Sequence, residues 1–165
     1  MEPFAAAGGL RRILDRLTRL LVNGKHQMLQ LKPLDPNVPI FQHLSTDVLP
    51  VVLVHVFNVA AVDVPALLNA WEADANWMKR QPGYITTQLH LGIAGSTVFM
   101  NYAVWESVAH FRAAFSHPEF KKALEHYPSS AVASPHLFTR LTVQNLCVGP
   151  YGNRHFLKWA WRVGV

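Results

Sequence analysis

The chain has 165 residues, of which 50% are hydrophobic and 15% are charged. This length is enough for one globular domain with an ordinary core, and the composition excludes a disordered or fibrous chain. The net charge of +5 comes from basic residues that gather near both ends, and no basic run crosses the middle, so we expect no nucleic-acid partner.

The first 50 residues divide into two segments. Residues 1–23 place leucine and isoleucine at helical spacing with arginines between them, which predicts an amphipathic helix. Such a helix could pack on the domain or on a partner, could be a tail of little consequence, or could be a targeting or membrane-surface segment. Prolines interrupt residues 24–50, so we expect a connector without regular elements and place the domain boundary there.

Residues 51–148 carry an alternation of strand and helix signals. The first stretch is β-branched and almost continuously apolar, which predicts a strand buried on both faces. Asp63 and Ser107 are typical helix N-caps, and Pro65 suits a first helical turn. A glycine-containing turn predicts a hairpin, and Pro135 is expected just before the last strand. The expected strands are 51–59, 84–91, 97–105 and 136–148. The expected helices are 64–80 and 108–115, and Pro118 separates the second helix from a further turn at 119–127.

The order β-α-β-β-α-β is that of the ferredoxin-like split unit. We therefore expect an α+β fold with both helices on one face of a four-stranded antiparallel sheet. The other face must also be covered, because the first strand is apolar on both sides. A homodimer that pairs two sheets face to face is the economical solution, and it would form a dimeric α+β barrel.

The third expected strand carries the residues best suited to chemistry. Because side chains alternate along a strand, Phe99, Asn101, Ala103 and Trp105 share one face. A buried Asn101 must bond to backbone, water or ligand, because leaving its polar atoms unpaired costs about 1–3 kcal/mol. Trp105 lies roughly 13 Å further along, so the two could hold opposite ends of a flat polycyclic ligand. The alternative is that both residues are structural, since an asparagine in a strand can pair with a neighbouring chain and tryptophan is a common core residue.

The sequence NYAVWES at residues 101–107 resembles the signature of the antibiotic biosynthesis monooxygenase (ABM) family, and specifically of the anthrone monooxygenases of aromatic polyketide pathways. Trp77, the sequence QPGY at 81–84 and then His90 keep the family's order and spacing. The similarity covers roughly residues 51–143. It implies a dimeric α+β barrel and an enzyme that uses O₂ as co-substrate without metal, flavin or haem.

The resemblance implies catalytic roles for two residues. Asn101 would hydrogen-bond the substrate's oxygen and stabilise enolate or peroxide character, and Trp105 would hold the flat ring system. The substrate would be the electron source, since a deprotonated anthrone or hydroquinone reduces O₂ directly. Phe111 stands where the family enzyme has a tyrosine, and Glu125 where it has an arginine, so the proton donor is unassigned.

Further residues are expected to bind the substrate: Phe99, Phe111, Trp71, Trp77 and His90. His90 could also act as a base, because imidazole titrates near neutrality, although a structural histidine is the alternative. Haem-degrading relatives need a histidine where this chain has Leu124, and no histidine spacing suggests a metal site, so we expect no cofactor.

Three functions remain open on these grounds. The first is a cofactor-independent monooxygenase that oxidises an aromatic polyketide of anthrone or hydroquinone type in secondary-metabolite biosynthesis. The second is a redox-neutral tailoring enzyme, such as a cyclase or dehydratase, on the same scaffold. The third is a non-catalytic dimeric ligand-binding protein. Cys147 is the only cysteine and no apolar run is long enough for a transmembrane segment, so we expect a cytoplasmic protein, with residues 149–165 as a tail.

Overall fold

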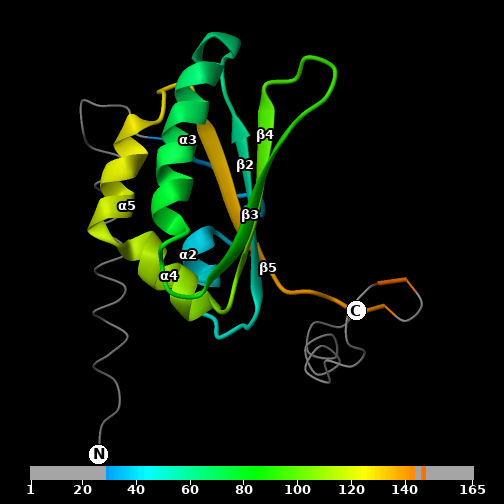
Figure 1. The fold of residues 1–165 in the computed structure, drawn as a ribbon. Helices are drawn as coiled ribbons and strands as arrows, with labels where there is room; N and C mark the ends of the chain where they lie inside the picture. Colours follow the sequence, from blue (N-terminus) through cyan, green and yellow to red (C-terminus); the bar gives the residue numbers. More distant parts are fainter. Residues whose placement is uncertain (1–28, 144–145, 148–165) are drawn as a thin grey trace, which may run out of the picture.

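The computed structural model describes residues 29–143 and 146–147 (Figure 1). The expected N-terminal helix at 1–23 and the tail at 149–165 lie outside these residues. No helix in the described part of the chain is long and apolar enough to cross a membrane. The elements are β1 (Gln30–Leu31), α2 (Ile40–His43), β2 (Val51–Asn58), η1 (Ala61–Asp63), α3 (Val64–Met78), β3 (Tyr84–Leu91), β4 (Val98–Trp105), α4 (Val108–Ser116), α5 (Pro118–Ala123), η2 (Leu124–His126) and β5 (Val132–Phe138).

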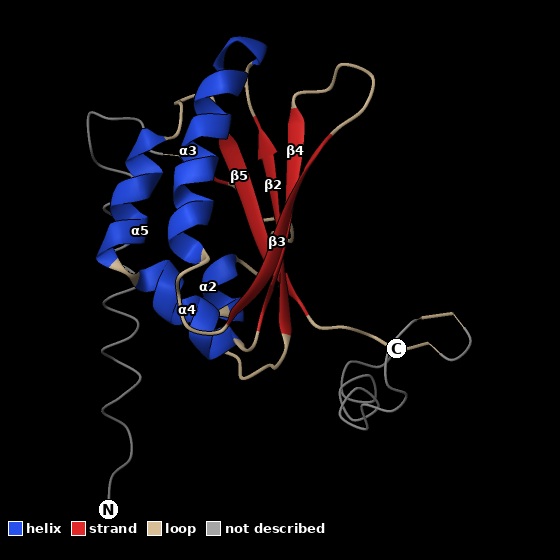
Figure 2. Cartoon of the chain, in the orientation of Figure 1, coloured by secondary structure: helices blue, strands red, loops and turns tan. Residues whose placement is uncertain are grey.

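The strands form one five-stranded sheet in the order β1-β5-β2-β4-β3. Strands β5, β2, β4 and β3 pair antiparallel in the order of a ferredoxin-like unit, which confirms the expected α+β fold. The expectation of four strands was one strand short, because β1 joins the edge parallel to β5. Helices α3, α4 and α5 lie together on one face of the sheet (Figures 1 and 2), as the handedness of the connections requires.

The segment before β2 contributes to the core, whereas we had expected a connector without regular elements. Leu29, Ile40 and Leu44 are buried and join the two hydrophobic clusters between sheet and helices. Pro39 occupies the N-cap position of α2, where a missing N–H breaks no helical hydrogen bond. The Arg112 guanidinium on α4 donates to the Leu44 carbonyl oxygen at 2.8 Å, which ties the end of this segment to the domain.

The last strand begins earlier and ends earlier than expected. Pro135 lies in the middle of β5 and not before it, and residues 139–143 have no regular structure. The Ala131 and Ala133 carbonyl oxygens accept hydrogen bonds from the N–H groups of Gln30 in β1 and Lys32 just after it, so odd-numbered residues along β5 direct their backbone polar atoms away from β2. Pro135 shares this orientation at a point where β1 has ended. Its missing N–H therefore removes no hydrogen bond from the sheet.

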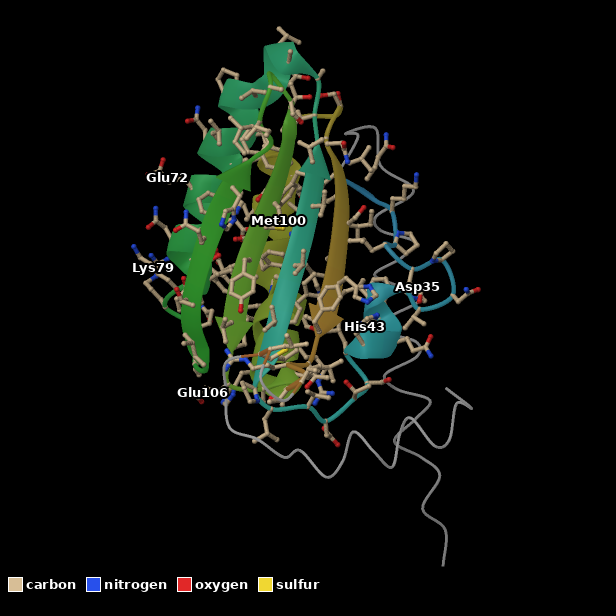
Figure 3. All side chains as sticks on the ribbon, turned by 90° about the vertical axis from the view of Figure 1, so that its right-hand side faces the viewer. Asp35, His43, Glu72, Lys79, Met100 and Glu106 are labelled. Carbon is tan, nitrogen blue, oxygen red and sulfur yellow. The ribbon has the colours of Figure 1, made fainter. Side chains whose placement is uncertain are left out.

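His43 covers the remainder of this sheet edge. Its ring nitrogens lie 3.2 Å from the Leu137 carbonyl oxygen on β5 and 3.0 Å from the Val38 carbonyl oxygen. The ring also packs edge-on against His136, with 4.1 Å between ring centroids. Figure 3 shows His43 on α2, beside the lower end of β5. The single turn of α2 is thus fastened to the domain.

Helices α3 and α4 begin after the expected N-cap residues, but only one of these residues caps its helix through its side chain. Ser107 caps α4, and its Oγ accepts a hydrogen bond from the His110 backbone N–H at 3.2 Å. Asp63 stands at the N-cap position of α3, but its carboxylate accepts from the Ser130 hydroxyl instead of a backbone N–H. Asp63 therefore joins the start of α3 to the loop that precedes β5.

Replacing Leu44 by alanine tests whether residues before β2 belong to the core. Leu44 is 3% exposed, so the substitution should lower the free energy of unfolding by about 2–5 kcal/mol through lost burial and a residual cavity. Leu34→Ala is the matched control, because Leu34 is 47% exposed in the same segment and its loss should cost about 0.5 kcal/mol or less. Urea unfolding measures both. Equal, small effects would mean that the segment is a dispensable connector.

Candidate functional site

A polar row crosses the helix-covered face of the sheet between the two hydrophobic clusters. His55 on β2 pairs with Asn101 on β4 and with Pro135 on β5. The next residues of β2 on this face, Leu53 and Phe57, belong to different clusters. The apolar core is thus interrupted at its centre, where two strands place an imidazole and a carboxamide side by side.

A cavity of about 50 Å³ lies above this row, between the sheet and the helices. Aromatic and aliphatic side chains form most of its wall, and the polar groups in it come from His55, Asp74, Tyr84, Thr87 and Asn101. The volume is enough for a few water molecules, but it is well below the roughly 150 Å³ of an engineered cavity that binds benzene. An aromatic ligand would therefore have to displace partly exposed wall residues.

Asn101 is 8% exposed and is held by a neighbouring strand. The Thr87 hydroxyl on β3 donates to Asn101 Oδ1 at 2.5 Å. A shift in the register of β3 between Tyr84 and Thr86 allows both Tyr84 and Thr87 to face the cavity. With its carbonyl end engaged, the carboxamide keeps its Nδ2 hydrogens available as donors toward the cavity.

Trp105 lies at the end of β4 and is 2% exposed. Its ring meets Tyr84 edge-to-face at a centroid distance of 5.5 Å and Phe111 at 5.6 Å. Such pairs are more favourable than their buried area alone, so the indole is held between two elements of the fold. Phe111 also lines the cavity, at the position where the resemblance would place a tyrosine.

His55 is a residue that we did not predict for this site. Its Nε2 is buried and has no hydrogen-bond partner among the described residues. Burial lowers the pKa of His55 from 6.5 to about 3, because the charged imidazolium would lose its hydration. At neutral pH the ring is therefore uncharged, and its Nε2 can donate or accept one hydrogen bond with a bound molecule, depending on the tautomer.

Asp74 on α3 faces the same cavity. The Tyr127 hydroxyl donates to Asp74 Oδ2 at 3.2 Å, whereas Oδ1 is buried without a partner in the described part of the chain. Burial raises the pKa of Asp74 to about 7, and the hydrogen bond from Tyr127 opposes this rise. Burial and the neighbouring carboxylate raise the pKa of Tyr127 well above its ordinary value. Near neutral pH, Asp74 therefore exchanges between its acid and carboxylate forms.

The predicted substrate residues do not all lie together. Four predicted residues line the cavity, namely Asn101, Trp105, Phe111 and Trp71. Phe99 is buried in the core outside the lining, and Trp77 stacks on Phe120 at 6.4 Å. His90 is exposed and pairs with Met100, which lies on the face away from the helices (Figure 3). The structure therefore does not bring Phe99, Trp77 or His90 to the cavity.

Two of the additional residues carry a signal in the sequence. His55 is a single polar residue inside an apolar strand, two positions from residues on the buried face. Asp74 follows Trp71 by three positions and precedes Met78 by four, so it shares their helix face. Tyr127 is 53 residues from its partner and carries no local signal. Within residues 29–143 and 146–147, no group of three histidine, cysteine or acidic residues could hold a metal ion.

The shifted pKa values of His55 and Asp74 predict opposite effects of pH on the stability of the fold. His55 in the folded chain resists protonation between about pH 6.5 and 3, so its contribution to stability falls as the pH drops through this window. Asp74 retains its proton up to about pH 7, so its contribution falls as the pH rises from 3.8 to about 7. The two effects oppose each other over most of this window.

Single substitutions should reveal each effect in thermal unfolding curves across this pH range. In Asp74→Asn, Tm should fall as the pH is lowered from about 6.5 to 4, because only the His55 effect remains. In His55→Gln, Tm should fall as the pH is raised from about 4 to 7, because only the Asp74 effect remains. The double variant is the control and should lack both slopes. Parallel curves for wild type and both single variants would disprove the shifts.

This chain is similar in sequence and fold to several known proteins. The family model described as antibiotic biosynthesis monooxygenase matches residues 50–126. A candidate monooxygenase from Shewanella loihica PV-4 is 34% identical, with 58% of this chain and 97% of that chain covered and a TM-score of 0.50. SnoaB, a cofactor-independent oxygenase from Streptomyces nogalater, is 22% identical, with 59% and 99% covered and a TM-score of 0.54. Among curated proteins, none matches this chain.

The matched residues contain most of the cavity wall. They run from the start of β2 to the end of η2 and so include His55, Asp74, Asn101 and Trp105. A candidate antibiotic biosynthesis monooxygenase from Caulobacter crescentus CB15 shares the fold at 13% identity, with 57% of this chain and 92% of that chain covered and a TM-score of 0.52. The chain belongs to the antibiotic biosynthesis monooxygenase family.

Proposed function

We propose that this chain is a cofactor-independent monooxygenase that oxidises an aromatic, polyketide-type substrate with O₂. The observation that carries the proposal is the cavity in which the Asn101 carboxamide and the Trp105 indole lie on one wall of an otherwise apolar, aromatic-lined space. The fold shared with SnoaB, which is a cofactor-independent oxygenase, supports this reading. An anthrone or hydroquinone of a secondary-metabolite pathway is the substrate class that fits best.

The chemistry requires no electrons other than those of the substrate. A methylene carbon flanked by aromatic rings loses a proton, and the resulting carbanion transfers electrons to O₂ and forms a C–O bond. The peroxide takes up the proton and then loses water as the second C–H bond breaks. The balance is CH₂ plus O₂ giving C=O plus H₂O, so the substrate supplies the four electrons that O₂ accepts.

The residues of the cavity would stabilise the negative charge that develops on the substrate and would hold the substrate in position. Asn101 Nδ2 would donate to the oxygen on which the enolate charge collects, a role in which a fixed donor favours the transition state. Trp105 and Phe111 would pack against a flat ring, and the apolar wall would exclude bulk water. Entry of the ring would require the side chains of Trp71 and Met78 on α3 to move, because the cavity is small.

We further propose a homodimer in which the outer faces of two sheets meet. Val98, Met100 and Phe138 lie on the face away from the helices and are 36%, 37% and 42% exposed. Figure 3 looks onto this face, with Met100 near its centre. Apolar side chains that are exposed on one face of a sheet favour burial against a partner, and a second copy offers the same surface. The cytoplasmic location stays a prediction, based on the cysteine content.

Oxygen consumption with emodin anthrone, in the presence of a metal chelator, tests the oxygenase. Asn101→Ala should lower turnover by about 100-fold or more, because a fixed donor to the developing oxyanion is lost. Trp105→Phe should mainly raise KM, because a smaller ring packs the substrate less well. Asn58→Ala is the matched control, since Asn58 is exposed at the end of β2, and it should retain wild-type turnover.

Two outcomes would contradict the oxygenase proposal. Unchanged turnover in both Asn101→Ala and Trp105→Phe would show that the chemistry occurs elsewhere. Product formation under strict anaerobiosis would favour the redox-neutral tailoring enzyme, since the oxidation of the methylene to a carbonyl consumes one O₂ for each product molecule.

Substitution on the outer face tests the dimer. Met100→Glu should convert a dimer into a monomer, because it would bury two carboxylates against an apolar surface. Ile93→Glu is the control, since Ile93 is 90% exposed in the turn between β3 and β4. Light scattering after size-exclusion chromatography measures the mass of each variant. A wild-type chain that remains monomeric at micromolar concentration would contradict the proposal.

A further inference from the structure

The oxygenase reaction begins with removal of a proton, which the side chains of Asn101, Trp105 and Phe111 cannot accept. Two buried polar atoms of the cavity lack partners among the described residues, namely Asp74 Oδ1 and His55 Nε2. We propose that Asp74 is the general base of this site and that its substrate is a neutral, enolisable aromatic ketone or phenol without a carboxylate. This inference rests on the proposed function and assigns it a catalytic residue and a substrate class.

The position of Asp74 suits this role. Trp71, Asp74, Ala75 and Met78 line the cavity from one face of α3, and Asn101 lines it from the sheet opposite. The Tyr127 hydroxyl holds Oδ2, so the carboxylate cannot turn freely and Oδ1 remains for the substrate. A substrate between helix and sheet would thus meet a proton acceptor on one side and the Asn101 hydrogen-bond donor on the other.

The proton and the electron pair can be followed through the first step. The substrate C–H bond breaks, its proton goes to Asp74 Oδ1, and the electron pair stays on the substrate as the enolate. The negative charge moves to the substrate oxygen, which Asn101 Nδ2 contacts. No O₂ is needed for this step. The carboxylic acid formed can later return the same proton to the peroxide.

The electrostatics of the cavity favour a base that works near neutral pH. In the described part of the chain, Tyr127 from the segment after η2 contacts Asp74, and the titratable groups that line the cavity with it are His55 from β2 and Tyr84 from β3. Burial raises the pKa of Asp74 to about 7, which brings a carboxylate into the range where general bases are most effective. His55 remains uncharged because burial lowers its pKa to about 3.

The charged groups in the cavity wall determine which charge on a substrate can be accommodated. Among the described residues, none of those that line the cavity is lysine or arginine. An anionic ligand would therefore lose its hydration and face the Asp74 carboxylate without a compensating cation. A neutral molecule with one acidic C–H or O–H and one oxygen acceptor satisfies Asp74, Asn101 and His55 without this penalty.

Hydrogen exchange with solvent isolates the proton step from the oxygen step. We would incubate anthrone in D₂O without O₂ and follow deuterium at its methylene carbon by mass spectrometry. The wild-type chain should accelerate exchange above the solvent rate, and Asp74→Asn should lose about 100-fold or more of this acceleration. Asp74→Glu should recover part of it. Glu72→Gln is the control on the same helix, since Glu72 is exposed and should exchange at the wild-type rate.

Tyr127→Phe separates a base from a merely structural carboxylate. Its hydroxyl lowers the pKa of Asp74, so its loss should move the pH profile of exchange toward higher pH while the plateau at high pH is retained. A structural defect would lower exchange at every pH. A profile that does not move in Tyr127→Phe would overturn the role of Asp74 Oδ1.

The remaining outcomes distinguish this inference from the proposed function. Wild-type exchange in Asp74→Asn, or no exchange above solvent in the wild type, would overturn the base even if O₂ consumption is observed. Exchange that depends on Asp74 without any O₂ consumption would support the base and refute the oxygenase. A carboxylated anthrone that exchanges as fast as anthrone would overturn the neutral-substrate class.

Discussion

The central constraint on this fold is the placement of polar side chains at the middle of an apolar core. His55 and Asn101 pair across two central strands, and Asp74 lies over the same cavity. Each unpaired buried polar atom costs about 1–3 kcal/mol, a cost that apolar residues at these positions would not carry. Two hydrophobic clusters flank the row and offset this cost. Features that oppose stability and persist at a cavity are typical of functional sites.

Two polar side chains of the cavity, Asn101 and Asp74, are each held by a neighbouring hydroxyl group that engages only one of their polar atoms. Thr87 binds one end of the Asn101 carboxamide, and Tyr127 binds one oxygen of Asp74. Each partner fixes the orientation of a side chain while the opposite atom remains toward the cavity. A site built in this way needs little rearrangement when charge develops on a substrate, which is the condition for efficient electrostatic stabilisation.

The sequence pattern correctly predicted those features of the site that depend on the alternation of side chains along a strand. Alternation along β4 placed Asn101 and Trp105 on one buried face, and their neighbours on the two flanking strands follow from the ferredoxin-like order. His90 was misplaced for a physical reason, because the register shift between Tyr84 and Thr86 reverses which residues of β3 face the helices. The pairing of Asp74 with Tyr127 joins residues that no local pattern connects.

The edge of the sheet beyond β5 has a bearing on how copies of this chain can associate. Several of the backbone groups that point outward there are already used or missing, since Lys32 just after β1 donates to the Ala133 carbonyl, Pro135 has no N–H and His43 contacts the Leu137 carbonyl. A strand from another molecule would find few hydrogen bonds to make on this side. Edge-to-edge aggregation and strand exchange through β5 are therefore disfavoured, so self-association on this side of the sheet would depend on side chains and not on backbone hydrogen bonds.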